Sequence, residues 1–144
     1  MVTVALAGKE ELFEILNFYR DIGYRGGARE TDTILVARIE DRVIGAVRLC
    51  TEESVIVLRG MQISREYQRQ GIGTRLLNEC VPFFNAGISY CLPYDHLMGF
   101  YQQIDFQPVN PAELPNFLRQ RLAGYHVLDK KIIAMRRRPE RCKR

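Results

Sequence analysis

The sequence lacks the features that mark a membrane protein or a multidomain protein. No apolar run approaches the roughly 18 residues that a membrane-spanning helix requires, and the chain starts without the basic segment of a secretory signal. Internal repeats, linkers and low-complexity segments are also missing. The 144 residues, of which 47% are hydrophobic and 26% charged, therefore predict one globular domain, which we expect to be cytoplasmic and not bound to a membrane.

Metal-binding patterns are missing as well. The four cysteines show no CxxC spacing, and the two histidines do not form a neighbouring pair. Structural zinc sites normally need such closely spaced ligands. We therefore expect no metal, and we expect free thiols in a reducing cytosol.

The positive charge is concentrated at the C-terminus. The formal net charge is +4, but the last nine residues hold six of the 21 basic and one of the 17 acidic residues, so the remainder carries 15 basic and 16 acidic residues. We assign residues 1–138 to the domain and residues 139–144 to a basic tail. Such a tail can contact nucleic acid or an acidic partner. A solvated terminus is the favoured interpretation. Nucleic-acid binding is disfavoured, because no aromatic residue is interleaved with the basic residues of the tail.

Hydrophobic periodicity predicts alternating strands and helices. Strands are expected at residues 2–7, 34–39, 43–50, 54–63, 88–92, 106–109 and 131–136, and helices at residues 9–19, 74–84, 96–104 and 112–122. Pro82 should kink or shorten its helix, and Asp95 is a candidate N-cap for the next one. Three successive strands on short polar turns, followed by crossover helices, indicate an α+β domain with a mixed sheet.

Residues 68–74 are the most informative segment. A strand and a polar turn lead into Gly71 and Gly73, and a helix follows. Glycine lets an anion approach the backbone, and the free N–H groups at a helix N-terminus bind phosphate. Arg69 and Arg75 add positive charge. The segment lacks the lysine of a P-loop and the third glycine of the Rossmann fingerprint, so those two nucleotide-binding classes are excluded.

The same segment resembles a family signature. Residues 68–73 (QRQGIG) match the pattern Q/R-x-x-G-x-G/A, which is similar to the acetyl-CoA signature of the GNAT superfamily of N-acetyltransferases, and residues 97–106 (LMGFYQQIDF) resemble a later block of that family. The resemblance covers about residues 34–109 and is typical of a small bacterial member. It implies a mostly antiparallel mixed sheet flanked by helices and splayed between its fourth and fifth strands. It also implies acetyl-CoA as co-substrate.

The resemblance further implies roles for individual residues. The fourth strand would pair with the pantetheine arm of the co-substrate as an added strand does, and the glycine-containing loop would hold the pyrophosphate through its amides. Tyr101 is the candidate general acid, because an unperturbed tyrosine with a pKa near 10 is protonated at neutral pH. The expected co-substrate-binding residues are Met61, Gln62, Ile63, Gln68, Arg69, Gln70, Gly71, Ile72, Gly73 and Thr74.

Two positions depart from the family pattern. Asp105 stands where the family usually has glycine, so we expect a positive φ there, which Asp tolerates better than most residues. The fourth strand carries Arg59 where many members have an acidic general base, and the nearby acidic residues are expected in solvated turns. These residues are Glu52, Glu53 and Glu66. No general base is therefore assigned.

The predicted function is transfer of the acetyl group of acetyl-CoA to a primary amine by direct attack on the thioester. A small-molecule acceptor such as an amino acid or a polyamine is favoured. Arg119 or Arg121 would then face an acceptor carboxylate, a hypothesis that rests on charge alone, and solvated helix charges are the favoured interpretation of both residues. Acetylation of protein N-termini or lysine side chains and a non-catalytic acyl-CoA sensor remain alternatives, as do a monomer and a homodimer.

Overall fold

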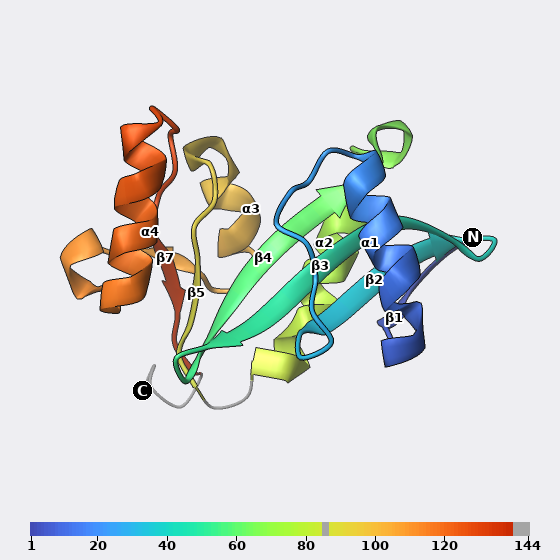
Figure 1. Ribbon diagram of the computed structural model, residues 1–144, viewed down its shortest axis with the longest axis horizontal. Coiled ribbons are helices and arrows are strands. Elements are labelled where there is room, and N and C mark those ends of the chain that lie inside the picture. Colours follow the sequence, from blue (N-terminus) through green and yellow to red (C-terminus); the bar gives the residue numbers. More distant parts are fainter. Residues whose placement is uncertain (85–86, 140–144) are drawn as a thin grey trace.

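The computed structural model describes residues 1–84 and 87–139, and it contains one mixed sheet with helices on both faces (Figure 1). The strand order is β1-β2-β3-β4-β5-β7-β6. The strands are β1 Val2–Leu6, β2 Thr33–Ile39, β3 Arg42–Glu52, β4 Val55–Ile63, β5 Ser89–Cys91, β6 Gln107–Pro108 and β7 Met135–Arg137. The α-helices are α1 Leu12–Asp21, α2 Ile72–Cys80, α3 Met98–Gln102 and α4 Asn116–Val127. The predicted α+β fold with a mostly antiparallel sheet is confirmed.

Apolar side chains that alternate along the strands form a hydrophobic core on each face of the sheet. On β2, Leu35 and Ala37 belong to the core under α2 and α3, while Ile34 and Val36 pack with α1. A side-chain period of two places such neighbours on opposite faces. A third cluster joins Val57 of β4 to α4, so α1 and α4 share one face of the sheet.

Local deviations follow from particular residues. α2 ends at Cys80, and a 3-10 turn, Val81–Phe84, carries Pro82, so the predicted shortening is confirmed. The predicted N-cap role of Asp95 is wrong. Asp95 opens the 3-10 turn Asp95–Leu97, the cap position belongs to Tyr94, and no side chain caps that turn.

Three further predictions concern the basic tail, membrane-spanning helices and the backbone conformation of Asp105. Apart from Pro139, the predicted basic tail lies outside the described residues. No helix within residues 1–84 and 87–139 is long and apolar enough to cross a bilayer. Asp105 has a φ of 74°, as expected for a position where the family usually has glycine.

The sheet divides between β4 and β5. These two strands run parallel and pair at only three positions, of which Leu58 with Cys91 is the last. β5 ends there, whereas β4 continues to Ile63 with β3 as its neighbour on the other side. The implied splay is confirmed, and it leaves one edge of the C-terminal half of β4 without a partner strand (Figure 1).

Candidate active site

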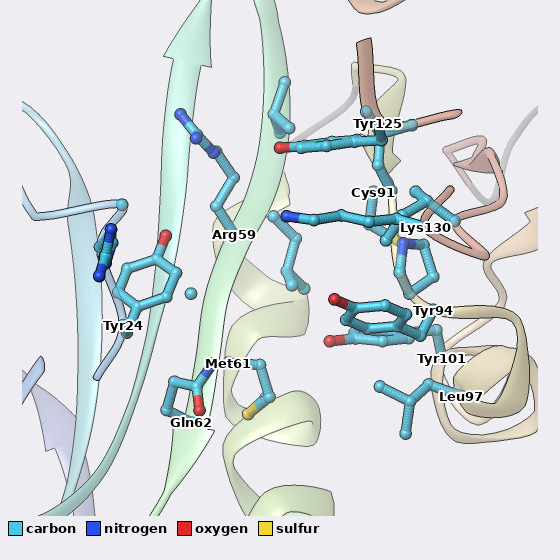
Figure 2. Close-up of a pocket in the computed structure, with 18 of the residues that line it drawn as sticks. Tyr24, Arg59, Met61, Gln62, Cys91, Tyr94, Leu97, Tyr101, Tyr125 and Lys130 are labelled. Carbon is cyan, nitrogen blue, oxygen red and sulfur yellow. The ribbon is translucent and has the colours of Figure 1, made fainter. Parts of the chain in front are cut away.

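A cleft of about 660 Å³ occupies the gap where β4 and β5 diverge (Figure 2). Its floor is the stretch of β4 from Val57 to Gln62, and one wall is the loop that follows α1. The other wall combines the segment after β5 with side chains from α3 and α4. The lining residues of these walls are Ile22 to Gly26, Cys91 to Tyr94, Leu97, Tyr101, Arg121, Tyr125, Lys130 and Ile132.

A β-bulge interrupts β4 at the floor of the cleft. The register with β3 shifts so that Gly60 and Met61 together lie opposite Val47. Gly60 has a φ of +65°, and its carbonyl accepts a 2.7 Å hydrogen bond from the hydroxyl of Tyr19. An added Cβ at Gly60 would lie 3.0 Å from that hydroxyl oxygen. Glycine is therefore required both by the backbone conformation and by the close approach of α1.

Met61 and Gln62, two of the predicted co-substrate-binding residues, line this cleft, and Ile63 follows them at the end of β4. Because this edge of β4 has no partner strand, its backbone N–H and C=O groups are available to an extended ligand. The carbonyl of Ile63 accepts a 3.0 Å hydrogen bond from the side-chain amide of Gln68. That bond ties the start of the glycine-containing loop to the end of the strand.

The predicted pyrophosphate loop lies outside the residues that line the cleft, at the N-terminus of α2. Gly71 occupies the N-cap position with a φ of +81°, Arg69 also has a positive φ, and no side chain caps the helix. The first-turn N–H groups of an α-helix have no partner within the helix, so those of Ile72, Gly73 and Thr74 are available to an anion.

Side chains of this loop have separate structural roles. Ile72 is buried in the core, and a Cβ on Gly73 would lie 3.2 Å from the ring of Phe100. The hydroxyl of Thr74 donates a 3.3 Å hydrogen bond to Gln103, and the amide of Gln70 donates at 3.4 Å to the carbonyl of Glu66. Backbone groups, rather than these side chains, are therefore what the loop offers to a ligand.

Tyr101 extends from α3 to the cleft and is 6% exposed. The rings of Phe100 and Phe106 contact it edge-on, and burial raises the pKa of Tyr101 well above the ordinary tyrosine value. Its hydroxyl finds no hydrogen-bond partner within the described chain. Figure 2 shows the hydroxyls of Tyr94 and Tyr101 pointing into the cleft from the same wall. Tyr101 can therefore donate a proton to a molecule bound in the cleft.

Cys91, at the end of β5, also lines the cleft, but it is a poor nucleophile. Burial raises the pKa of its thiol well above the ordinary value, and the thiolate is the reactive form. Neither histidine lines the cleft. This arrangement favours direct transfer over a covalent enzyme intermediate.

A buried ion pair fixes the loop that forms one wall of the cleft. The guanidinium of Arg48 on β3 donates a 2.9 Å hydrogen bond to Asp32, and the two side chains are 2% and 4% exposed. Arg48 also donates to the hydroxyl of Tyr24 at 3.0 Å and to the carbonyl of Gly26. The loop between α1 and β2 is thereby attached to the sheet beside Gly60.

The sequence did not identify this anchor, nor Tyr24, Tyr94, Tyr125 and Lys130 as lining residues. A signal for the anchor exists, because Arg48 interrupts an otherwise apolar strand (VIGAVRLC). Buried arginine is rare unless it is paired, so such an interruption predicts an ion pair. The partner, 16 residues earlier, has no comparable signal.

Cationic side chains line the cleft from its floor and from both of its walls. Arg25, Arg59, Arg121 and Lys130 line it, and none of the described lining residues is Asp or Glu. Glu52, at the end of β3, lies beside Arg121 and accepts two hydrogen bonds from it, at 2.7 and 3.3 Å. Burial tends to raise the pKa of Glu52, but the hydrogen bonds and charge of Arg121 outweigh it and lower that pKa. Glu52 is therefore an ion-pair partner rather than a general base.

Comparison with known proteins identifies the family of the chain. A family model for the GNAT acetyltransferase domain matches residues 30–108, which include the floor of the cleft, the loop before α2 and Tyr101. A search of curated proteins found no match. Within the described residues, no group of three or more potential metal ligands is found.

Solved structures with low sequence identity share the fold. N-acetylglutamate synthase from Neisseria gonorrhoeae, complexed with coenzyme A and N-acetyl-glutamate, is 17% identical with a TM-score of 0.71, over 97% of this chain and 35% of that one. Escherichia coli ElaA is 15% identical with a TM-score of 0.69, over 95% and 99% of the two chains. An acyl-CoA N-acyltransferase from Pseudomonas aeruginosa is 17% identical with a TM-score of 0.65, over 95% and 99%. This chain thus spans 35% of the synthase chain but nearly all of the two smaller proteins.

Proposed function

The chain belongs to the GNAT acetyltransferase family, and from this premise we propose that it transfers the acetyl group of acetyl-CoA to the primary amine of a small molecule. One observation carries the proposal: the unpartnered edge of β4 and the hydroxyl of Tyr101 face the same cleft. A cleft between two strands suits a narrow acceptor better than a protein surface, because both walls rise beside β4. The similar fold of N-acetylglutamate synthase, whose structure contains coenzyme A and N-acetyl-glutamate, adds support.

The residues present fit acetyl-CoA. Amide groups of the pantetheine arm require backbone partners, and Met61 and Gln62 lie on the strand edge that offers them. The pyrophosphate requires N–H donors and positive charge. The N-terminus of α2 supplies the donors, and Arg69 and Arg75 lie beside it.

The chemistry supplied by the bound co-substrate is a thioester, whose C–S bond breaks as the acceptor nitrogen bonds to the carbonyl carbon. A backbone N–H of the Gly60–Met61 bulge would stabilise the negative charge that develops on the carbonyl oxygen. Tyr101 would donate its proton to the departing sulfur, because burial keeps its phenol neutral. Water in the open cleft would accept the proton lost by the amine, since no carboxylate lines the cleft in the described structure.

The test combines calorimetric titration with acetyl-CoA and an assay of thiol release on a panel of primary amines. Tyr101→Phe should bind acetyl-CoA as the unmodified protein does but lose about 10²- to 10⁴-fold in kcat, the range for general acid catalysis. Tyr90→Phe is the matched control, because Tyr90 is also buried but does not line the cleft.

Three results would contradict the proposal in different ways. Binding without turnover on any amine would make the protein an acyl-CoA sensor. Turnover that survives Tyr101→Phe but is lost in Tyr94→Phe would assign the proton donor to the neighbouring hydroxyl. Failure to bind either acetyl-CoA or CoA would remove the co-substrate assignment itself.

A further inference from the structure

The charges along the cleft restrict the acceptor. Four cationic side chains line the cleft, and Glu52, the carboxylate that the described structure places beside Arg59 and Arg121, is already engaged. Its two hydrogen bonds to Arg121 make that pair electrically neutral. The guanidinium of Arg59 lies farther from Glu52, at 3.7 Å, and shares a carboxylate whose stronger bonds go to Arg121. The positive charge of Arg59 is therefore largely uncompensated.

Lys130 provides a second uncompensated charge, on the wall of the cleft that includes α4. It forms no ion pair within the described chain, and its ammonium lies 5.5 Å from the ring centroid of Tyr125. Figure 2 shows the amino group of Lys130 reaching from the α4 side toward β4, which carries Arg59. The two cations thus face one space from two elements that are distant in the sequence.

These charges are separate from the predicted pyrophosphate loop. Arg59 precedes Ile63 by four residues, so at about 3.3 Å per residue it lies roughly 13 Å back along β4 from the end where the loop begins. The face of β4 also differs. Glu52, Arg121 and Lys130 belong to the α4 side of the sheet, while α2, which follows the loop, covers the opposite face. An anion that binds between them would therefore be a group other than the co-substrate phosphates held by the loop.

We infer that the acceptor amine carries a carboxylate, and that Arg59 and Lys130 bind it; this inference rests on the proposed acetyl transfer. A guanidinium can bind a carboxylate through two parallel hydrogen bonds, and an ammonium adds a point charge with three donors. The hydroxyls of Tyr24 and Tyr125 line the same space and can donate to further polar groups. A polyamine is excluded as the acceptor, since its additional ammonium groups would face cations without a lining carboxylate.

The experiment compares pairs of acceptors that differ only in the carboxylate. Each α-amino acid is assayed beside the amine formed by removing its carboxyl group, with acetyl-CoA in excess and thiol release as the readout. The variants Arg59→Gln and Lys130→Gln should each raise KM for the amino acid by about 10- to 100-fold, because a hydrogen bond to a charged group is lost. They should leave kcat and the affinity for acetyl-CoA unchanged within about twofold.

Lys131→Gln is the matched control, because it removes the same charge from the adjacent, exposed residue, which does not line the cleft. It should leave KM for every acceptor unchanged. Equal kcat/KM for the amino acid and its decarboxylated partner, or an equal loss on both in Arg59→Gln, would overturn the inference while leaving the proposed acetyl transfer intact.

A binding measurement separates the inference from the proposed function. Calorimetry in the presence of CoA compares an N-acetyl amino acid with the corresponding N-acetyl amine, which lacks the carboxylate. Tighter binding of the carboxylate compound, weakened in Arg59→Gln and Lys130→Gln but not in Lys131→Gln, would support the carboxylate site without any turnover. No preference for the carboxylate compound would refute it, even if CoA binds.

Discussion

Replacing Arg48 with methionine is expected to destabilise the protein strongly, although Arg48 lies outside the lining of the cleft. The change removes the buried partner of Asp32, together with hydrogen bonds to Tyr24 and Gly26. Asp32 is 4% exposed, so its carboxylate would be left without its cation. Removing one member of a buried ion pair costs about 3–5 kcal/mol. For a chain of 144 residues this corresponds to a fall in Tm of about 10–15 °C.

An exposed ion pair of similar length supplies the control. Arg42 and Glu66 are 3.1 Å apart, but their side chains are 62% and 65% exposed. Glu66→Gln should therefore change the free energy of unfolding by less than about 1 kcal/mol. The assay is urea denaturation followed by circular dichroism, with thermal unfolding as a second measurement.

Activity provides an independent readout of the same substitution. Arg48 attaches the loop between α1 and β2, which forms one wall of the cleft, so Arg48→Met should raise KM for the acceptor even at temperatures where the protein stays folded. The double variant Arg48→Met/Asp32→Leu should recover part of the lost stability, because no charge remains buried. A single variant within 1 kcal/mol of the unmodified protein, or a double variant less stable than both single variants, would refute this reasoning.

Three further predictions concern the bulge, the Glu52 pair and the proton donor. Gly60→Ala places a Cβ beside the hydroxyl of Tyr19 at a φ of +65° and should cost about 1–2 kcal/mol in urea denaturation and lower kcat; an unchanged kcat would show that the bulge is not needed for catalysis. Because the pKa of Glu52 is lowered, its pair with Arg121 stabilises the protein above the unfolded pKa of about 4.3, and this contribution is lost as the pH falls through the folded value. The difference in unfolding free energy between the unmodified protein and Glu52→Gln should therefore shrink from pH 7 to pH 3.5, and a constant difference would contradict the pairing. Since burial raises the pKa of Tyr101, kcat/KM should increase with pH as the amine loses its proton and show no decline up to about pH 10; a decline near pH 9 that is absent in Tyr101→Phe would contradict the raised pKa of Tyr101.

Local patterns in the sequence were sufficient for the elements and for one half of the candidate site. Apolar residues at a spacing of two or of three to four predict strands and helices because each element must bury one face, and β2 and α2 follow that pattern closely. The loop at residues 68–74 was identifiable for a similar reason. A helix N-terminus exposes its N–H groups wherever it occurs, and Gly71 marks the change of backbone conformation that starts the helix.

The bounds of short elements were less predictable. The predicted strand at residues 131–136 forms only as β7, Met135–Arg137, because Ile132 instead makes an isolated bridge to Tyr94. Where a short strand begins and ends depends on which segment of the chain lies beside it, and sequence periodicity carries no information about that neighbour.

The sequence by itself therefore determined the order of the elements, the family signature and the uncapped start of α2 at Gly71, since each depends on residues only a few positions apart. The tertiary structure alone decided the half of the cleft in which we propose that the acceptor binds. It opens because β5 ends at Cys91 while β4 continues, and its charges come from Arg59 and Lys130, which are distant in the chain. Convergence of that kind depends on strand register and helix placement, which are set by the packing of the whole core rather than by any local pattern.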